Sequence, residues 1–336
     1  MLTAEQRRAT ALSIAREQLP GGTIPWFRGG KWDPWDHVEC VLGLDSAGLR
    51  DAARRGLDFL ARAQRVDGAW ACPIVGGRED SEVLDANAAG YIAVGQWHHF
   101  LVRPDRAFLE ASWPAVERAI AFVLELQRPD GSIAWARNLA GDVGDHALLA
   151  GCSCIVVSLR CAVQIADEVG EPKPDWELAQ VELEDAVRGD SSFADRGRYS
   201  MDWYYPVLSG ALDRESARAR LAARWDEFVV EGLGARCVND RPWITSAETA
   251  ELVMACELCG MNDEARTLFS WIQYQRANDG SYWTGATFPD GRHFPNERST
   301  WSAAAMLLAD DVLERRGPIA DILIAPSRAT EPSLTS

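Results

Sequence analysis

The chain has 336 residues, of which 47% are hydrophobic, and this is enough apolar material for one large core. A formal net charge of −16 excludes nucleic acid as the expected partner, because binding to phosphate backbones needs clustered cations. The first twenty residues have the pattern of an amphipathic helix, and no run approaches the roughly 20 apolar residues of a membrane span. We therefore expect a cytoplasmic protein with no membrane partner.

Two kinds of helix alternate along the chain. Inner helices, rich in small and apolar residues as befits helices buried on most faces, are predicted at residues 34–46, 84–101, 145–168, 202–211, 245–260 and 299–314. Outer helices, which carry more charge, are predicted at residues 49–65, 106–127, 175–187, 214–231 and 263–276. A sixth outer helix, at 4–18, is expected to close against the last inner one. This pattern predicts an all-α (α/α)6 toroid.

Three near-copies of one phrase support this repeat architecture. Each starts with Gln-Arg, passes through an Asp-Gly pair and reaches an aromatic residue; the copies are 64–70, 127–135 and 275–283. Each also comes after an apolar helical run, which is typical of repeated helix pairs, and its glycine can end the helix in the left-handed conformation. We expect one catalytic domain over residues 1–316 and a disordered tail over residues 317–336.

The toroid places the start of every inner helix at one end, so polar residues there should share a mouth. They are Asp33, Asp36, Asp85, Asn87, Asp145, His146, Asp202, Ser246, Glu248, Glu297, Ser299 and Thr300. Helix capping explains one carboxylate per helix, but it does not explain the aromatic residues of the same loops. Carboxylates among aromatic rings favour a carbohydrate site, since acids bind hydroxyls and rings pack on the apolar faces of sugars.

Cleavage of a glycosidic bond normally uses two carboxyl groups, one as proton donor and one as base or nucleophile. Asp33 lies at the tip of the first inner helix and Glu248 near the start of the fifth. Because these repeats are not adjacent, we expect the wider separation of about 6.5–9.5 Å that admits a water molecule and gives inversion. We predict Glu248 as general acid and Asp33 as general base, with Asp36, Asp85 and Asp202 as substitutes.

The remaining predicted site residues bind substrate. They are Trp26, Trp32, His37, Asp85, Trp135, Asp202, Trp203, Tyr204, Tyr205, Trp243 and Trp283. No cofactor or metal is expected. The eight cysteines are predicted to be reduced, and Cys256 and Cys259, although spaced as C-x-x-C, lie within an apolar helix without a second ligand pair.

These motifs support two family resemblances. The Gln-Asp-Gly-Trp phrases resemble the QW repeats of terpene cyclases, but the D-x-D-D and D-D-x-x-D motifs of those enzymes are missing. Segments 27–39, 201–206 and 240–249 resemble the actinobacterial prenyltransferase-like toroid proteins, in particular the mycobacterial methylmannose polysaccharide hydrolases, and the likeness runs over residues 24–308.

The second resemblance implies an (α/α)6 fold and endo-hydrolysis of α-1,4-linked, 3-O-methylated mannose chains. It places the acids of the family at Asp33 or Asp36 and at Glu248. The expected partner is an oligosaccharide or polysaccharide, and the protein is a monomer or a homo-oligomer. Two alternatives remain open from the residues: a terpenoid cyclase or prenyltransferase-like protein with an apolar aromatic pocket, and a lectin-like toroid without catalysis.

Overall fold

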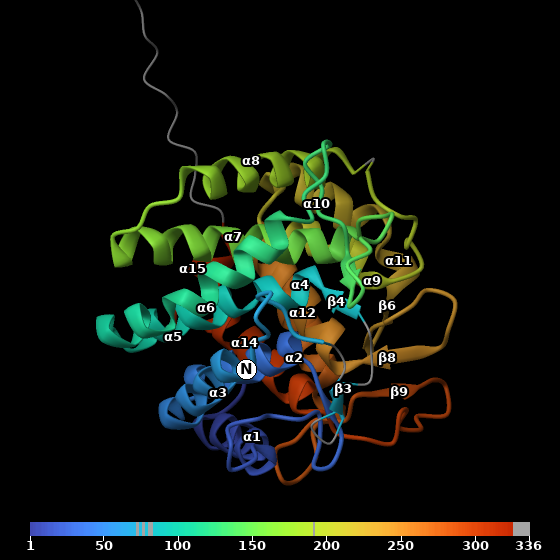
Figure 1. The fold of residues 1–336 in the computed structure, drawn as a ribbon. Coiled ribbons are helices and arrows are strands. Elements are labelled where there is room, and N and C mark those ends of the chain that lie inside the picture. Colours follow the sequence, from blue (N-terminus) through green and yellow to red (C-terminus); the bar gives the residue numbers. More distant parts are fainter. Residues whose placement is uncertain (72–73, 76–77, 80–82, 191, 325–336) are drawn as a thin grey trace, which may run out of the picture.

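The computed structural model describes residues 1–71, 74–75, 78–79, 83–190 and 192–324, and these form an (α/α)6 toroid (Figure 1). Its inner helices are α2 (Pro34–Ser46), α4 (Ala86–Gly90) with α5 (Ile92–Val102), α7 (Leu149–Val169), α9 (Ser200–Leu208), α12 (Ser246–Cys259) and α14 (Thr300–Glu314). Each inner helix packs against the inner helix of the next repeat, and α14 packs against α2, which closes the ring. The predicted architecture is confirmed.

The outer helices lie at the predicted places. They are α3 (Arg50–Ala63), α6 (Arg106–Leu124), α8 (Pro174–Gly189), α10 (Arg214–Ala223) with α11 (Trp225–Phe228), α13 (Asn262–Trp271) with the 3-10 turn η1 (Ile272–Gln275), and α1 (Ala4–Glu17). Helix α1 packs against α14, as expected. Arg7 holds it there through ion pairs of 2.6 Å to Asp310 and 2.7 Å to Asp311, both buried.

Short antiparallel pairs of strands lie among the loops that lead into the inner helices. One sheet has the order β1 (Lys31–Trp32), β2 (Ile74–Val75) and β3 (Arg78–Glu79). The other pairs are β4 (Val83–Asp85) with β5 (Ala136–Asn138), β6 (Val229–Val230) with β7 (Gly234–Ala235), and β8 (Trp243–Thr245) with β9 (Gly285–Thr287). Strands β1, β4 and β8 run almost directly into α2, α4 and α12, so they fix where these helices begin.

Two predicted inner helices differ from the structure. The second is broken at Tyr91 into α4 and α5, and the third begins at Leu149 rather than at 145. Residues before Leu149 are extended because Ala147 bridges to Ala134 and Phe193. Contrary to expectation, α7 is apolar and long enough for a membrane span, but 83% of its most apolar window is buried inside the toroid, as in a core helix.

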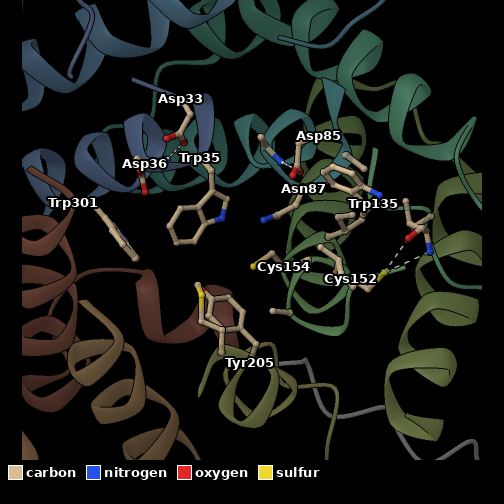
Figure 2. A pocket seen from close by; sticks show the side chains of 18 of the residues that line it. Asp33, Trp35, Asp36, Asp85, Asn87, Trp135, Cys152, Cys154, Tyr205 and Trp301 are labelled. Atoms are coloured by element: carbon tan, nitrogen blue, oxygen red, sulfur yellow. Dashed lines mark hydrogen bonds between the residues drawn. The ribbon is translucent and has the colours of Figure 1, made fainter. Parts of the chain in front are cut away.

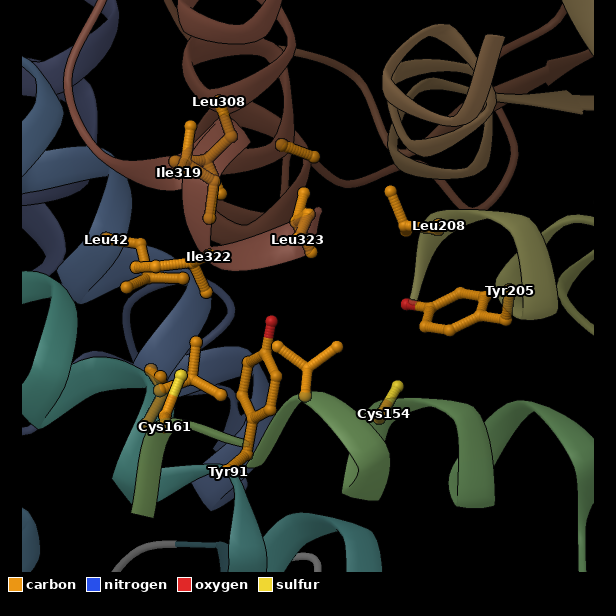
Figure 3. Packing of buried hydrophobic residues seen from close by; sticks show 14 of the residues in the cluster. Leu42, Tyr91, Cys154, Cys161, Tyr205, Leu208, Leu308, Ile319, Ile322 and Leu323 are labelled. Atoms are coloured by element: carbon orange, nitrogen blue, oxygen red, sulfur yellow. The ribbon is translucent and has the colours of Figure 1, made fainter. Parts of the chain in front are cut away.

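The predicted disordered tail begins too early. Residues Ile319–Leu323 form the short helix α15, which packs against α5, α7 and α14 over the buried apolar cluster of the barrel (Figure 3). Ile319, Ile322 and Leu323 are buried there, near Leu42 and Leu308. The apolar spacing of this segment outweighs the polar composition of the residues after it, and the rest of the predicted tail, 325–336, lies outside the described residues.

The repeated phrases are the joints between neighbouring outer helices. A Cβ on Gly68 would lie 2.1 Å from the carbonyl oxygen of Arg118 in α6, and one on Gly131 would lie 2.6 Å from that of Glu182 in α8. A Cβ on Gly280 would lie 2.5 Å from the carbonyl carbon of Ala9 in α1. Each Asp-Gly turn therefore touches the backbone of the next outer helix, and only glycine permits that approach.

We expect Gly68→Ala to destabilise the protein by roughly 2–4 kcal/mol, because the new methyl group collides with backbone and φ is +87°. Gly29→Ala is the matched control, since its φ is +81° but nothing lies within 4 Å of its Cβ. The difference between the two in urea unfolding isolates the contact with α6. Equal losses in both variants would contradict this account of the joint.

Candidate active site

A cavity of about 400 Å³ opens at the end of the barrel where the inner helices begin (Figure 2). Its polar lining is Lys31, Asp33, Asp36, Asp85 and Asn87, and its aromatic lining is Trp35, Trp135, Tyr205 and Trp301. The apolar remainder is Ala86, Ala88, Ile133, Leu148, Ala150, Gly151, Cys152, Cys154, Ile155 and Met201. Helices α2, α4, α7, α9 and α14 all contribute, so the shared mouth predicted from topology exists.

Asp33 and Asp36 form a carboxyl pair at the start of α2. Asp33 is the N-cap: it accepts from the backbone N–H of Asp36 at 2.9 Å and from Nε1 of Trp26 at 3.2 Å. Asp36 is buried, and burial together with the adjacent Asp33 raises its pKa well above the ordinary value, although Lys31 and Trp26 act in the opposite direction. Burial and the neighbouring Asp33 thus both favour the protonated form of Asp36.

Asp85 lies on the other side of Trp35 from this pair (Figure 2). It caps α4, accepting from the backbone N–H of Ala88 at 3.0 Å, and burial raises its pKa to about 6. Next to it, Asn87 extends into the cavity, and its Oδ1 is buried without a hydrogen-bond partner among the described residues. A sugar hydroxyl could meet both groups.

Glu248 lies in the first turn of α12 and is buried, but it is not among the residues that line this cavity. Burial raises the pKa values of Cys237 and Glu251, and the nearby charge of Glu248 raises them further. The carboxylate of Glu248 therefore lies close to both groups. Among the described inner helices of the six repeats, α12 belongs to the one repeat whose inner helix contributes no residue to the cavity lining. It lies between α9 and α14. Glu248 thus lies on the inner helix between α9 and α14, outside the lining of this cavity.

The aromatic lining is held from below by buried carboxyl groups. Trp35 stacks on Tyr91 with ring centroids 5.3 Å apart, and the Tyr91 hydroxyl donates to Glu39. Tyr205 donates to Glu251 at 2.9 Å, and Tyr204 donates to the same carboxyl group. Trp301, which meets Trp35 edge-on at 5.6 Å, was not among the predicted site residues. Its place one residue after Thr300, at the start of α14, is the signal that could have identified it.

Several predicted substrate-binding residues have structural roles instead. His37 is fully buried: Ile24 donates to its Nδ1 and its Nε2 donates to Gly56, and burial lowers its pKa to about 4. Trp32 packs on His37 and Phe59. Neither of these two residues lines the cavity. Their contacts instead hold the loop before α2 in place.

The α9 residues also point elsewhere. Trp203 and Tyr204 are buried, with Trp203 stacked on Phe228 at 5.1 Å. Asp202 caps α7 by accepting from the N–H of Ala150 at 3.3 Å. Met201 and Tyr205, which are four residues apart and so share one face of α9, line the cavity, whereas Asp202, Trp203 and Tyr204 do not.

Of the remaining predicted aromatics, Trp26, Trp243 and Trp283 lie outside the cavity lining. Trp243 donates to the carbonyl of Phe294 at 2.6 Å, and Trp283 stacks on His293 at 4.1 Å. Trp26 stays at the mouth through its bond to Asp33. Trp135 lines the cavity as predicted, stacked on His146 with 5.9 Å between the rings.

We expect Glu39 to make the protein less stable as pH rises. Burial raises its pKa from 4.5 to about 7, so its stabilising contribution is complete below pH 4.5 and is lost as pH rises through 7. Full loss amounts to roughly 3 kcal/mol, at about 1.4 kcal/mol per pKa unit. Glu39→Gln, which keeps an acceptor for Tyr91, should reduce the difference in unfolding free energy between pH 5 and pH 8 by about this amount. Identical pH dependence in urea unfolding of both proteins would contradict the raised pKa.

The chain is 49% identical over 319 residues to the MMP endo-(1,4)-3-O-methyl-alpha-D-mannosidase of Mycolicibacterium hassiacum, covering 95% of this chain and 89% of that protein. No model of a protein family matches the chain.

Solved structures of glycosidases share the fold. One wild-type glycosidase aligns with a TM-score of 0.74 at 15% identity, over 96% of this chain and 97% of its own. A GH63 mannosylglycerate hydrolase from Thermus thermophilus, in complex with Tris and D-glycerate, aligns with a TM-score of 0.71 at 13% identity, over 90% and 99%. At these identities the likeness concerns the fold alone.

Proposed function

The chain belongs to the family of the MMP endo-(1,4)-3-O-methyl-alpha-D-mannosidase and is a glycoside hydrolase, and on this premise we propose that it cleaves internal α-1,4 bonds of a 3-O-methylated α-mannan. The observation that carries the proposal is the pair Asp33 and Asp36 inside a cavity walled by aromatic rings. Acids in such a cavity can bind hydroxyls and transfer a proton while the rings hold the pyranose faces.

In the proposed reaction Asp36 is the general acid. Burial raises the pKa of this carboxyl group and so favours its protonated form, which can give a proton to the oxygen of the leaving sugar. Asp33, which receives two N–H donors, supplies the negative charge that holds this proton on Asp36. This assignment differs from the sequence prediction, in which Glu248 was the acid and Asp33 the base.

Glu248 is the proposed base. It comes from α12, which α14 separates from α2, so in this proposal the base and Asp36 act from two inner helices that are not adjacent. That arrangement suits an inverting reaction, in which about 6.5–9.5 Å between the carboxyl groups leaves room for the attacking water. Asp85 and the rings of Trp35, Trp135 and Tyr205 would hold the sugars.

The test of this function is incubation of the purified protein with 3-O-methylmannose oligosaccharides, with and without EDTA, followed by product analysis. We expect internal cuts that give shorter oligosaccharides, at equal rates in both conditions. Intact oligosaccharides together with turnover of a prenyl diphosphate would instead support a terpenoid enzyme.

A further inference from the structure

We propose that Asn87 and Gly151 form a seat for the O-methyl group of a substrate sugar, which makes the enzyme select methylated over unmethylated chains. The Asn87 carboxamide would donate to the ether oxygen, and the methyl group would lie in the space beside Gly151. This inference rests on the proposed function and adds to it the feature of the cavity that recognises methylation.

The two walls of the cavity differ in chemistry. Lys31, Asp33 and Asp36 face it from one side, whereas the first turns of α7 contribute Ala150, Gly151 and other side chains without charge. Helix α7 begins without a side-chain cap on its N-cap residue and without an acidic residue in its first turn. The first turn of α7 thus gives the cavity no carboxylate of its own, whereas Asp33 and Asp85 cap the starts of α2 and α4 there.

Polar groups near this wall are already engaged with the protein. Asp202 takes the backbone N–H of Ala150, and the thiol of Cys152 exchanges hydrogen bonds with the backbone of Ile133 at 3.4 Å. A free hydroxyl placed against this wall would lose its bonds to water without full replacement, whereas a methyl ether, which has no proton to donate, would not.

Asn87 supplies the polar half of the seat. Its carboxamide extends into the cavity, with the nitrogen directed inward (Figure 2). Its Oδ1 is buried without a partner among the described residues, and a buried amide with an unmet bond is a place where a ligand completes the structure. A 3-O-methylated sugar can meet the inward end of the amide, because its ether oxygen accepts from the nitrogen.

The same amide directs the methyl group toward Gly151. A Cβ on Gly151 would be 3.7 Å from the Cβ of Asn87, so the two residues lie side by side in the cavity wall, and in this proposal the ether oxygen bonds to the amide on the side of the glycine. The methyl group on that oxygen then has the uncharged start of α7 as its neighbour.

Gly151 supplies the space. A Cβ there would meet nothing closer than 3.7 Å and its φ is not positive, so the backbone accepts alanine without strain. Alanine is also the better residue in a helix. The substitution therefore changes the cavity without harming the fold, and the methyl group that it adds would occupy the volume proposed for the methyl group of the sugar.

The experiment compares kcat/KM on 3-O-methylated and unmethylated α-1,4-mannooligosaccharides of equal length. We expect the wild type to prefer the methylated chain by at least about tenfold, and Gly151→Ala to reduce this preference at least about fivefold, mainly by lowering kcat/KM on the methylated chain. Gly189→Ala, in the outer helix α8 with nothing within 4 Å of its Cβ, is the matched control and should leave the preference unchanged.

Thermal unfolding of both variants verifies that they are folded. Equal cleavage of the two substrates by the wild type, or an equal loss on both in Gly151→Ala, would overturn the seat and leave the proposed function standing. Cleavage of neither substrate by the wild type would overturn the proposed function, and the seat with it.

Discussion

Asp36→Asn is expected to lower kcat on methylated mannan oligosaccharides by roughly 10³-fold or more while changing KM little, because general acid catalysis contributes about 10²–10⁴-fold. Asparagine keeps the shape of the side chain and its place beside Asp33, but it has no acidic proton for the departing oxygen. The raised pKa of Asp36, caused mainly by burial, is what fits it for this role at neutral pH.

The role of Asp36 can be separated from simple damage to the site. An oligosaccharide with a nitrophenolate leaving group needs no protonation of that group, so Asp36→Asn should cleave it far better relative to the wild type than it cleaves the natural linkage. If the variant lost both activities equally, or kept full activity on the natural chain, Asp36 would not be the acid.

Glu248→Gln is expected to cause a loss of similar size, roughly 10³-fold in kcat, because the attacking water is no longer deprotonated. Glutamine is close in size to glutamate, so the buried first turn of α12 should remain intact, which circular dichroism and thermal unfolding would verify.

Azide gives the signature of the lost base. As a small anion that needs no deprotonation, it should restore part of the turnover of Glu248→Gln and give a glycosyl azide of inverted configuration. It should not rescue Asp36→Asn. Rescue of Asp36→Asn rather than of Glu248→Gln would reverse the two assignments.

Much of the fold could be predicted from sequence because the repeat is local. The alternation of small-residue and charged helices, with an Asp-Gly turn after several outer ones, fixes the helix pairs before any long-range contact is known. The start of α7 could not be predicted in this way, because it depends on Ala147 pairing with Ala134 and Phe193, which only the folded chain brings together. Helix α15 was missed for a similar reason: its apolar side chains are buried only through contacts with α5, α7 and α14, which are distant in sequence.

The sequence was enough to predict which residues lie at the mouth of the barrel, but not which of their side chains face the cavity. Topology placed Asp33, Asp36 and Asp85 at one mouth, and they line one cavity. It could not tell which aromatic faces the cavity: both Trp203 and Tyr205 are buried, but only Tyr205 of the two lines the cavity. Nor could it assign the proton, since the raised pKa of Asp36 depends on its burial next to Asp33.

The most direct test of two carboxyl groups acting from separate helices is the stereochemistry of the first product. Proton NMR during cleavage of a 3-O-methylmannose polysaccharide by the wild type should show each new reducing end appearing first as the β-anomer, before mutarotation. A first product in the α-configuration would mean retention and a closer pair of carboxyl groups, and it would contradict the roles given to Asp36 and Glu248.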